Sequence, residues 1–299
     1  IISDDSNNNV LIGFEAGVGG GAAMADCVAI GSGAMNSTAA NAQTGTVAIG
    51  KDALTALTSG AYNTAVGYLA LQTNQDGSYN TAVGYESLEV FEANTLNHGS
   101  NTAVGYRAGR FVSTGTENTF VGVNAGVGIT GTRLEGDNNT AVGYSAGLLL
   151  QGAAASNTLV GAHSGDALTT GTQNTAIGAT ALSAATTATL NVAVGKDAMG
   201  DVKAGVVVDS CVAVGHSALK GNSSNTTAIN GSTAVGYRAL MAVTTGNANT
   251  GIGQDAGVSL TTGGYNAIVG ATAGDALTSG GYNTIVGYGA GTLLDEGSR

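Results

Sequence analysis

The sequence is dominated by one hexapeptide, Asn-Thr-Ala-Val-Gly-Tyr, which returns along almost the whole chain. Unchanged copies occupy residues 63–68, 80–85, 101–106 and 139–144. Weaker copies bring the total to sixteen, and consecutive repeat glycines lie 17 to 21 residues apart. A short period over a whole chain is typical of a solenoid or fibre, in which each repeat stacks on the last. The repeat glycines are Gly13, Gly31, Gly50, Gly67, Gly84, Gly105, Gly122, Gly143, Gly161, Gly178, Gly195, Gly215, Gly236, Gly253, Gly270 and Gly287.

The residues before each glycine predict a β-strand. With the glycine as position 0, position −1 is Val or Ile in all sixteen copies, and position −2 is apolar or Gly. Position −3 is Thr in ten copies, and position −4 is Asn in twelve. Many of these residues are β-branched, which favours a strand, and neighbouring side chains of a strand face opposite ways. Because both faces are apolar, we expect both to be covered, the second by another chain. We assign the repeat core to Val66, Val83, Val104 and Val142, with stacked amides at Asn63, Asn80, Asn101 and Asn139.

The second half of each repeat is less regular. Leu recurs at position +7, and Gly recurs at position +10, as in Gly60 and Gly280. A recurring Gly indicates a tight turn with positive φ, so we expect two short strands and two turns in each coil. Ala at position +3 in fourteen copies fits two sheets that approach closely.

Composition excludes several classes of protein. Fifty Gly without any Pro excludes collagen, and the nine Lys and Arg are scattered along a chain of net charge −11, so we expect no nucleic-acid partner. No apolar run is long enough to span a membrane, and no signal peptide is apparent at the N-terminus. No metal-ligand spacing and no nucleophile elbow is found, so we expect no cofactor and no enzyme activity. Both cysteines are expected to be buried, reduced thiols.

Binding residues are expected in the insertions that lengthen some repeats, because loops vary while the scaffold stays constant. Phe91, His98 and Arg133 lie in two such insertions. An aromatic ring, an imidazole and a guanidinium held close together could stack on and hydrogen-bond a surface glycan. The alternative is that these loops brace neighbouring chains. The ten Tyr occupy positions −5 and +1 and are expected to form stacked, partly exposed rows.

Cys27-Val28-Ala29-Ile30-Gly31 and residues 191–195, Asn-Val-Ala-Val-Gly, resemble the head repeats of trimeric autotransporter adhesins. The Asn-Thr-Ala-Val-Gly-Tyr form looks more like repeats in bacteriophage tail fibres. The resemblance covers about residues 9 to 291 and implies a parallel trimer of left-handed β-rolls. The coils are longer than those of adhesin heads, and no membrane anchor or coiled-coil stalk is present in the sequence, which favours the phage interpretation.

The sequence therefore predicts an all-β solenoid or β-roll of about sixteen coils, in an intertwined or side-by-side parallel homotrimer. Residues 1–8 would form a lead-in, 9–291 the fibre domain and 292–299 a tail. The leading hypothesis is a structural fibre protein in the phage virion, which contacts other tail proteins and attaches to a host glycan or protein. Alternatives are an adhesin on the bacterial cell surface, an ice- or surface-binding solenoid that presents its Thr row, and a glycan-cleaving tailspike.

Overall fold

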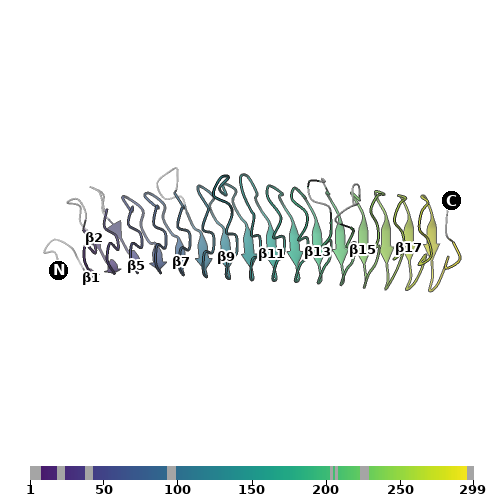
Figure 1. Cartoon of the computed structure of the whole chain (residues 1–299), viewed down its shortest axis with the longest axis horizontal. Coiled ribbons are helices and arrows are strands. Elements are labelled where there is room, and N and C mark those ends of the chain that lie inside the picture. The colour runs from purple at the N-terminus through teal and green to yellow at the C-terminus, as the bar shows by residue number, and fades with distance from the viewer. Residues whose placement is uncertain are drawn as a thin grey trace. The chain divides into compact units, whose positions relative to one another are not determined.

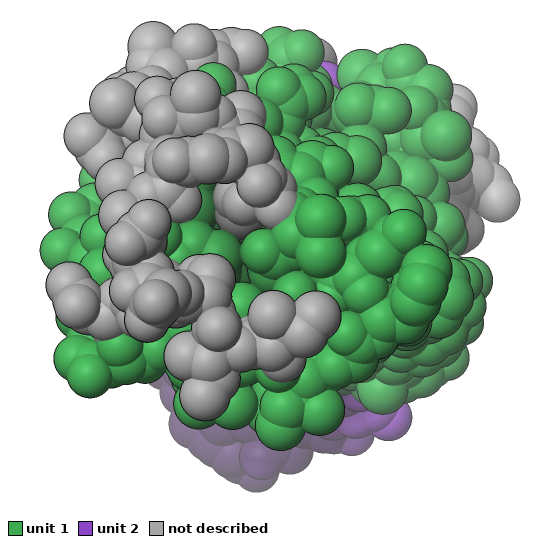
Figure 2. Space-filling model, turned by 90° about the vertical axis from the view of Figure 1, so that its left-hand side faces the viewer, with its two compact units in different colours: residues 1–145, 149–154 green, residues 146–148, 155–299 purple. Residues whose placement is uncertain are grey.

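A computed structural model gives the conformation of residues 8–18, 24–37, 43–92, 99–202, 205, 208–222 and 229–294. The chain divides into two compact units, which we describe separately (Figure 2). Unit 1 consists of residues 1–145 and 149–154, and unit 2 consists of residues 146–148 and 155–299. Every regular element in these described residues is a β-strand, and none is a helix. The all-β class predicted from the sequence is therefore confirmed.

Each unit is a parallel β-solenoid in which successive three-residue strands pair side by side and point the same way (Figure 1). Unit 1 contains β1 (Val10–Ile12), β2 (Met24–Ala25), β3 (Val28–Ile30), β4 (Gln43–Thr44), β5 (Val47–Ile49), β6 (Thr64–Val66), β7 (Thr81–Val83), β8 (Thr102–Val104), β9 (Thr119–Val121) and β10 (Thr140–Val142). Unit 2 contains β11 (Thr158–Val160), β12 (Thr175–Ile177), β13 (Val192–Val194), β14 (Val212–Val214), β15 (Thr233–Val235), β16 (Thr250–Ile252), β17 (Ala267–Val269) and β18 (Thr284–Val286).

Strand pairing keeps equal repeat positions together. Thr64 pairs with Thr81 and Val66 with Val83 across a 17-residue interval. The same register joins β7 to β8, although that interval is 21 residues long. The insertions therefore leave the strand row unchanged, as the sequence predicts.

The strand has one buried and one outward face. Position −2 points into the coil, where Ala65 and Ala82 are fully buried. Position −1 points outward, and Val66, Val83 and Val142 are half-buried, while 37% of Val104 is exposed. These four valines of the predicted repeat core therefore lie on the outer face of the coil, and the sequence leaves open which face the chain itself covers. A strand that is apolar on both faces carries no alternation that distinguishes the inner face from the outer.

The asparagines at position −4 form the expected ladder. The side-chain oxygen of Asn63 accepts hydrogen bonds from the backbone N and from Nδ2 of Asn80, both at 3.0 Å. The side-chain oxygen of Asn80 accepts the same two hydrogen bonds from Asn101, and that of Asn118 accepts them from Asn139. All of these asparagines are buried. Buried amides need hydrogen-bond partners for both their donor and their acceptor atoms. In the ladder, the Asn of one turn supplies the acceptor for the Asn of the next turn.

The same amides also tie the two halves of each turn together. Nδ2 of Asn63 donates to the carbonyl of Gly77 at 2.8 Å, and Nδ2 of Asn101 donates to that of Gly115 at 2.9 Å. These carbonyls lie at position +10, at the end of the return segment. Each Asn therefore closes its own turn and also stacks on its neighbours.

Two positions of each turn, −2 and +4, share the same space in the core, so that a large side chain at one is accompanied by a small residue at the other. Where position −2 is Ala, position +4 is commonly Leu or Met, as in Ala82 with Leu88. Where position −2 is large, position +4 is Gly, as in Leu159 with Gly165. A Cβ added at Gly165 would lie 2.8 Å from Cδ2 of Leu159, so the two large side chains exclude each other.

The turn at the repeat glycine requires Gly, because its φ is positive and the next turn lies against it. Gly67 has φ +141°, and a Cβ there would lie 2.2 Å from the carbonyl oxygen of Gly84. The expectation of positive φ at position +10 holds for Gly280 but is wrong for Gly60. Gly60 is instead required by close approach, because its Cβ would lie 2.1 Å from the carbonyl oxygen of Gly77.

The return half of the turn is less regular than predicted. Only β2 and β4 form a second pair of strands, and elsewhere the described return segments make isolated parallel bridges such as Ser78 with Gly99. Side chains at position +7 anchor this half in the core, and Leu57, Leu168 and Leu277 are fully buried. The second strand predicted for every coil is therefore wrong in most turns.

Candidate functional surfaces

The most uniform surface is the outer face of the strand row, formed by positions −3 and −1. In every repeat these two positions hold only Thr, Val, Ile or Ala, and none is charged. Their side chains are half-buried or exposed, with Ile177 at 41% and Val286 at 67%. A soluble protein normally places charges on an exposed strand face. We call this surface the strand face.

Tyrosine rows flank the strand face, as the sequence predicts. Tyr68 stacks on Tyr85 with ring centroids 5.1 Å apart, and Tyr85 stacks on Tyr106 at 5.4 Å. On the other flank Tyr62 stacks on Tyr79 at 5.4 Å, and in unit 2 Tyr265 stacks on Tyr282 at 5.0 Å. All of these rings are partly exposed: Tyr62, Tyr68, Tyr79, Tyr85, Tyr106, Tyr265 and Tyr282.

Stacking leaves the ring edges of these rows open and covers the faces between neighbours. The ammonium of Lys51 lies over the ring of Tyr68, 5.5 Å from its centroid, and the guanidinium of Arg107 lies over Tyr106 at 4.9 Å. Sugars bind aromatic side chains mainly through ring faces, so the Tyr68–Tyr106 row offers them little surface. It is better suited to line an interface with its edges and hydroxyl groups.

Two of the three predicted receptor-contact residues, Phe91 and Arg133, lie in the described part of the chain. Phe91 is fully buried at position +7, where other turns place Leu, so its ring fills the core and its assignment as a receptor contact was wrong. The sequence held this signal, because Phe91 follows Gly84 by the same seven residues that separate Leu57 from Gly50. His98 lies outside the described residues. Arg133 is exposed on its insertion.

One charged network joins two neighbouring turns of unit 1. Nε of Arg107 lies 2.9 Å from Oε2 of Glu86, and Nε of Arg110 lies 3.1 Å from the same oxygen. Arg110 also bonds Glu89 at 2.5 Å. The Glu86 carboxylate is almost fully buried, and its hydrogen bond raises the pKa of the Tyr85 hydroxyl. Sequence reasoning missed this network, although opposite charges at positions +2 and +5 of adjacent repeats could have indicated it.

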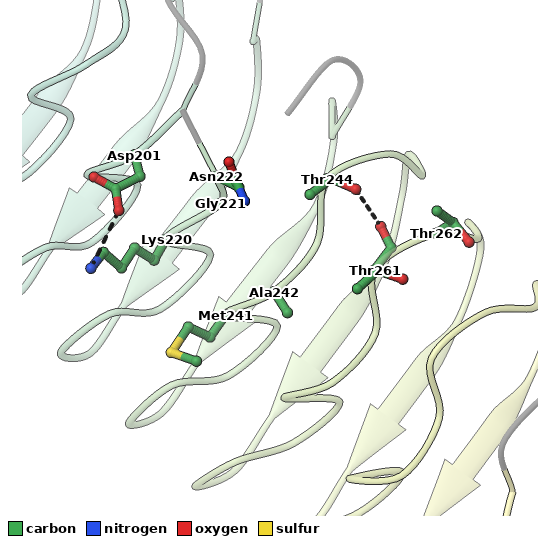
Figure 3. Close-up of a pocket in the computed structure, with 9 residues that line it drawn as sticks. All are labelled: Asp201, Lys220, Gly221, Asn222, Met241, Ala242, Thr244, Thr261 and Thr262. Atoms are coloured by element: carbon green, nitrogen blue, oxygen red, sulfur yellow. Dashed lines mark hydrogen bonds and ion pairs between the residues drawn. The ribbon is translucent and has the colours of Figure 1, made fainter. Parts of the chain in front are cut away.

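Unit 2 has a shallow groove on the return half of its turns, with a volume of about 590 Å³ (Figure 3). Its lining comes from four successive turns and combines an ion pair, threonine hydroxyls and the apolar side chains of Met241 and Ala242. Nζ of Lys220 lies 3.3 Å from Oδ2 of Asp201. The hydroxyl of Thr244 donates to the carbonyl of Thr261 at 3.0 Å.

Two histidines are followed directly by a serine, at His163–Ser164 and at His216–Ser217. Oγ of Ser217 lies 3.0 Å from Nδ1 of His216, whereas His163 and Ser164 contact other groups. Nδ1 of His163 lies 2.9 Å from Oδ2 of Asp166. The neighbouring Ser164 is fully buried and donates its hydroxyl to the carbonyl of Ala176 at 2.8 Å. Among the described residues, no three His, Cys, Asp or Glu side chains gather as metal ligands.

The two cysteines are free and buried, as predicted. Burial raises the pKa of Cys27 and raises that of Cys211 to about 11. Both replace an Asn at position −4, and each still takes its place in the ladder by donating its backbone N–H to the preceding Asn oxygen. They are structural thiols, since a reactive cysteine needs a lowered pKa and access to solvent.

No helix in the described part of the chain is long and apolar enough to cross a membrane. Comparison with models of protein families, with curated proteins and with solved structures finds no match for this chain.

Proposed function

We propose that this chain is a non-catalytic structural segment of a phage tail fibre, which assembles as a parallel homotrimer through the strand face and serves attachment to a host cell. The observation that carries the proposal is the absence of charge from positions −3 and −1 in all sixteen repeats, although these side chains are partly exposed. Exposed apolar surface of this kind marks protein–protein contact. A second and a third copy would cover it with the same rows.

The repeat suits a self-association of this type. Val66, Val83 and Val104 recur once per turn in a continuous parallel ladder. In two parallel copies these valines would therefore be spaced equally and could pack against each other turn by turn. The stacked tyrosines beside them are held by their neighbours, which lowers the conformational entropy lost on assembly. The Glu86–Arg107–Arg110 network lies outside positions −3 and −1 and would remain with its own chain.

Attachment to other virion tail proteins and to a host surface glycan or protein rests on the resemblance of the repeat to tail fibres. Localisation decides between this proposal and a bacterial surface adhesin. Mass spectrometry of purified virus particles and of cell envelopes from the source culture would locate the chain. Recovery from virus particles supports the proposal, and recovery from envelopes alone favours the adhesin.

An ice- or surface-binding role is a second candidate, favoured by the outward placement of the Thr row. Thr64, Thr81 and Thr102 lie in register on neighbouring strands, as a flat hydroxyl array requires. Val28, Val47 and several other residues interrupt the row at position −3. Thermal hysteresis measured on the purified protein tests this role. A clear gap between the melting and freezing points supports it, and the absence of a gap excludes it.

A further inference from the structure

We propose that the groove on the return half of unit 2 binds a short, neutral oligosaccharide. This inference rests on the proposed attachment function and names the ligand class. The groove is lined by positions +5 to +9 of its turns, so it does not use the strand face. Assembly through the strand face therefore does not require the groove to be covered.

The dimensions of the groove fit an elongated ligand. Its lining begins at Asp201 and ends at Thr262, and it crosses four turns. At about 4.8 Å per turn, three steps give a length of about 14 Å. The volume of about 590 Å³ lies within the range usual for small-molecule sites. A chain of sugar rings laid along the stack fits this shape better than a single ring.

Hydrogen-bonding groups of both kinds line the groove, as a polyhydroxyl ligand requires. The Lys220 ammonium has three donors and shares one with Asp201, which leaves others for a ligand. The hydroxyls of Thr244 and Thr261 donate to neighbouring carbonyls, at 3.0 and 2.8 Å. Their oxygens are thereby oriented as acceptors. Thr262 is exposed, and its hydroxyl makes no hydrogen bond within the described residues.

Two residues of the lining are apolar. The thioether chain of Met241 and the methyl group of Ala242 lie between the ion pair and the threonines (Figure 3). Methionine is flexible and polarizable and adapts to irregular surfaces. It could cover the C–H face of a sugar ring while the rim groups bind its hydroxyls.

The charges of the groove and of the whole chain favour a neutral ligand. Lys220 is paired with Asp201 at 3.3 Å, so the described residues that line the groove offer no uncompensated cation to a carboxylate or sulfate. The whole chain carries a net charge of −11, which repels polyanions. A neutral hexose oligomer needs no free cation in the groove and is not repelled by the negative chain.

Saturation-transfer NMR on the whole protein tests the inference with maltotriose, mannotriose and N,N′,N″-triacetylchitotriose as neutral probes and 3′-sialyllactose as the anionic probe. We expect at least one neutral probe to bind and the anionic probe not to bind. Lys220→Met should weaken that binding about ten-fold or more, because it removes a charged donor and keeps an unbranched apolar side chain of similar size. Asp201→Asn should admit 3′-sialyllactose, because it leaves the Lys220 charge uncompensated.

Lys196→Met is the matched control, since Lys196 pairs with Asp197 at 3.8 Å in the same unit but does not line the groove. Its binding should equal that of the unaltered protein. The inference is overturned if no neutral probe binds, if Lys220→Met binds as well as the unaltered protein, or if the anionic probe binds best. The mass of the protein in solution, measured in parallel, reports assembly independently. A trimer that binds no glycan rejects only the groove, and a monomer that binds glycan rejects only the trimer.

Discussion

The side-chain oxygen of Asn63 accepts two hydrogen bonds from Asn80, one from the backbone N and one from Nδ2, each at 3.0 Å. This contact recurs between neighbouring turns and is buried inside the coil. It couples the stacking of turns to the closure of each turn, because Nδ2 of Asn63 also holds the carbonyl of Gly77.

Asn80→Ala should therefore destabilise unit 1 by about 3 kcal/mol, since it leaves buried partners of the ladder without hydrogen bonds. Asn36→Ala is the control, because the Asn36 amide bonds Glu15 at an exposed site. Its effect should stay within about 0.5 kcal/mol. Denaturant unfolding measures both. Equal midpoints for the two variants would show that the ladder does not stabilise the coil.

The exchange of volume between Leu159 and Gly165 predicts a strong coupling. Leu159→Ala alone should cost about 2–5 kcal/mol, because it opens a cavity. Gly165→Leu alone should also destabilise, since its Cβ would lie 2.8 Å from Cδ2 of Leu159. The double variant recreates the Ala–Leu combination of other turns and should be more stable than the sum predicts, by about 1–3 kcal/mol. Additive effects in a double-mutant cycle would reject the exchange.

The sequence predicts the strand, the Asn ladder and the Tyr rows well, because each is a single repeat position whose residue type recurs. It does not distinguish Val83 from Ala82 as the outward residue, since both are apolar. It also misassigns Phe91, whose place at position +7 decides its burial more than its place beside an insertion does. The groove was not predicted, because residues from four turns form it and no single repeat contains its pattern.

The Arg238–Asp255 pair predicts a pH dependence. Nε of Arg238 lies 2.6 Å from Oδ1 of Asp255, and this hydrogen bond holds the pKa of Asp255 below its ordinary value of 3.8. A lowered folded-state pKa stabilises the protein above the unfolded-state pKa, and this stability is lost as the pH falls through the folded-state value. Arg238→Met should therefore lower the Tm at pH 7 and have no such effect at strongly acidic pH. A Tm difference that stays constant down to pH 2 would contradict this.

The buried thiols predict slow reaction with Ellman's reagent. The pKa of Cys211 is raised to about 11 by burial, so almost no thiolate exists at pH 8. The native protein should release almost no thionitrobenzoate within minutes, and the denatured protein should release two equivalents. Rapid release from the native protein would show that a thiol is accessible.

The central claim is that the strand face is covered by further copies of this chain, and the mass of the protein in solution tests it most directly. Sedimentation equilibrium should give three chains of 28.9 kDa for the unaltered protein. It should give a single folded chain for Val83→Asp and for Val142→Asp, because each places a charge in the apolar interface. Thr132→Asp, in an exposed insertion of the same unit, should remain a trimer. A single-chain mass for the unaltered protein, or a trimer of Val83→Asp, would contradict the account.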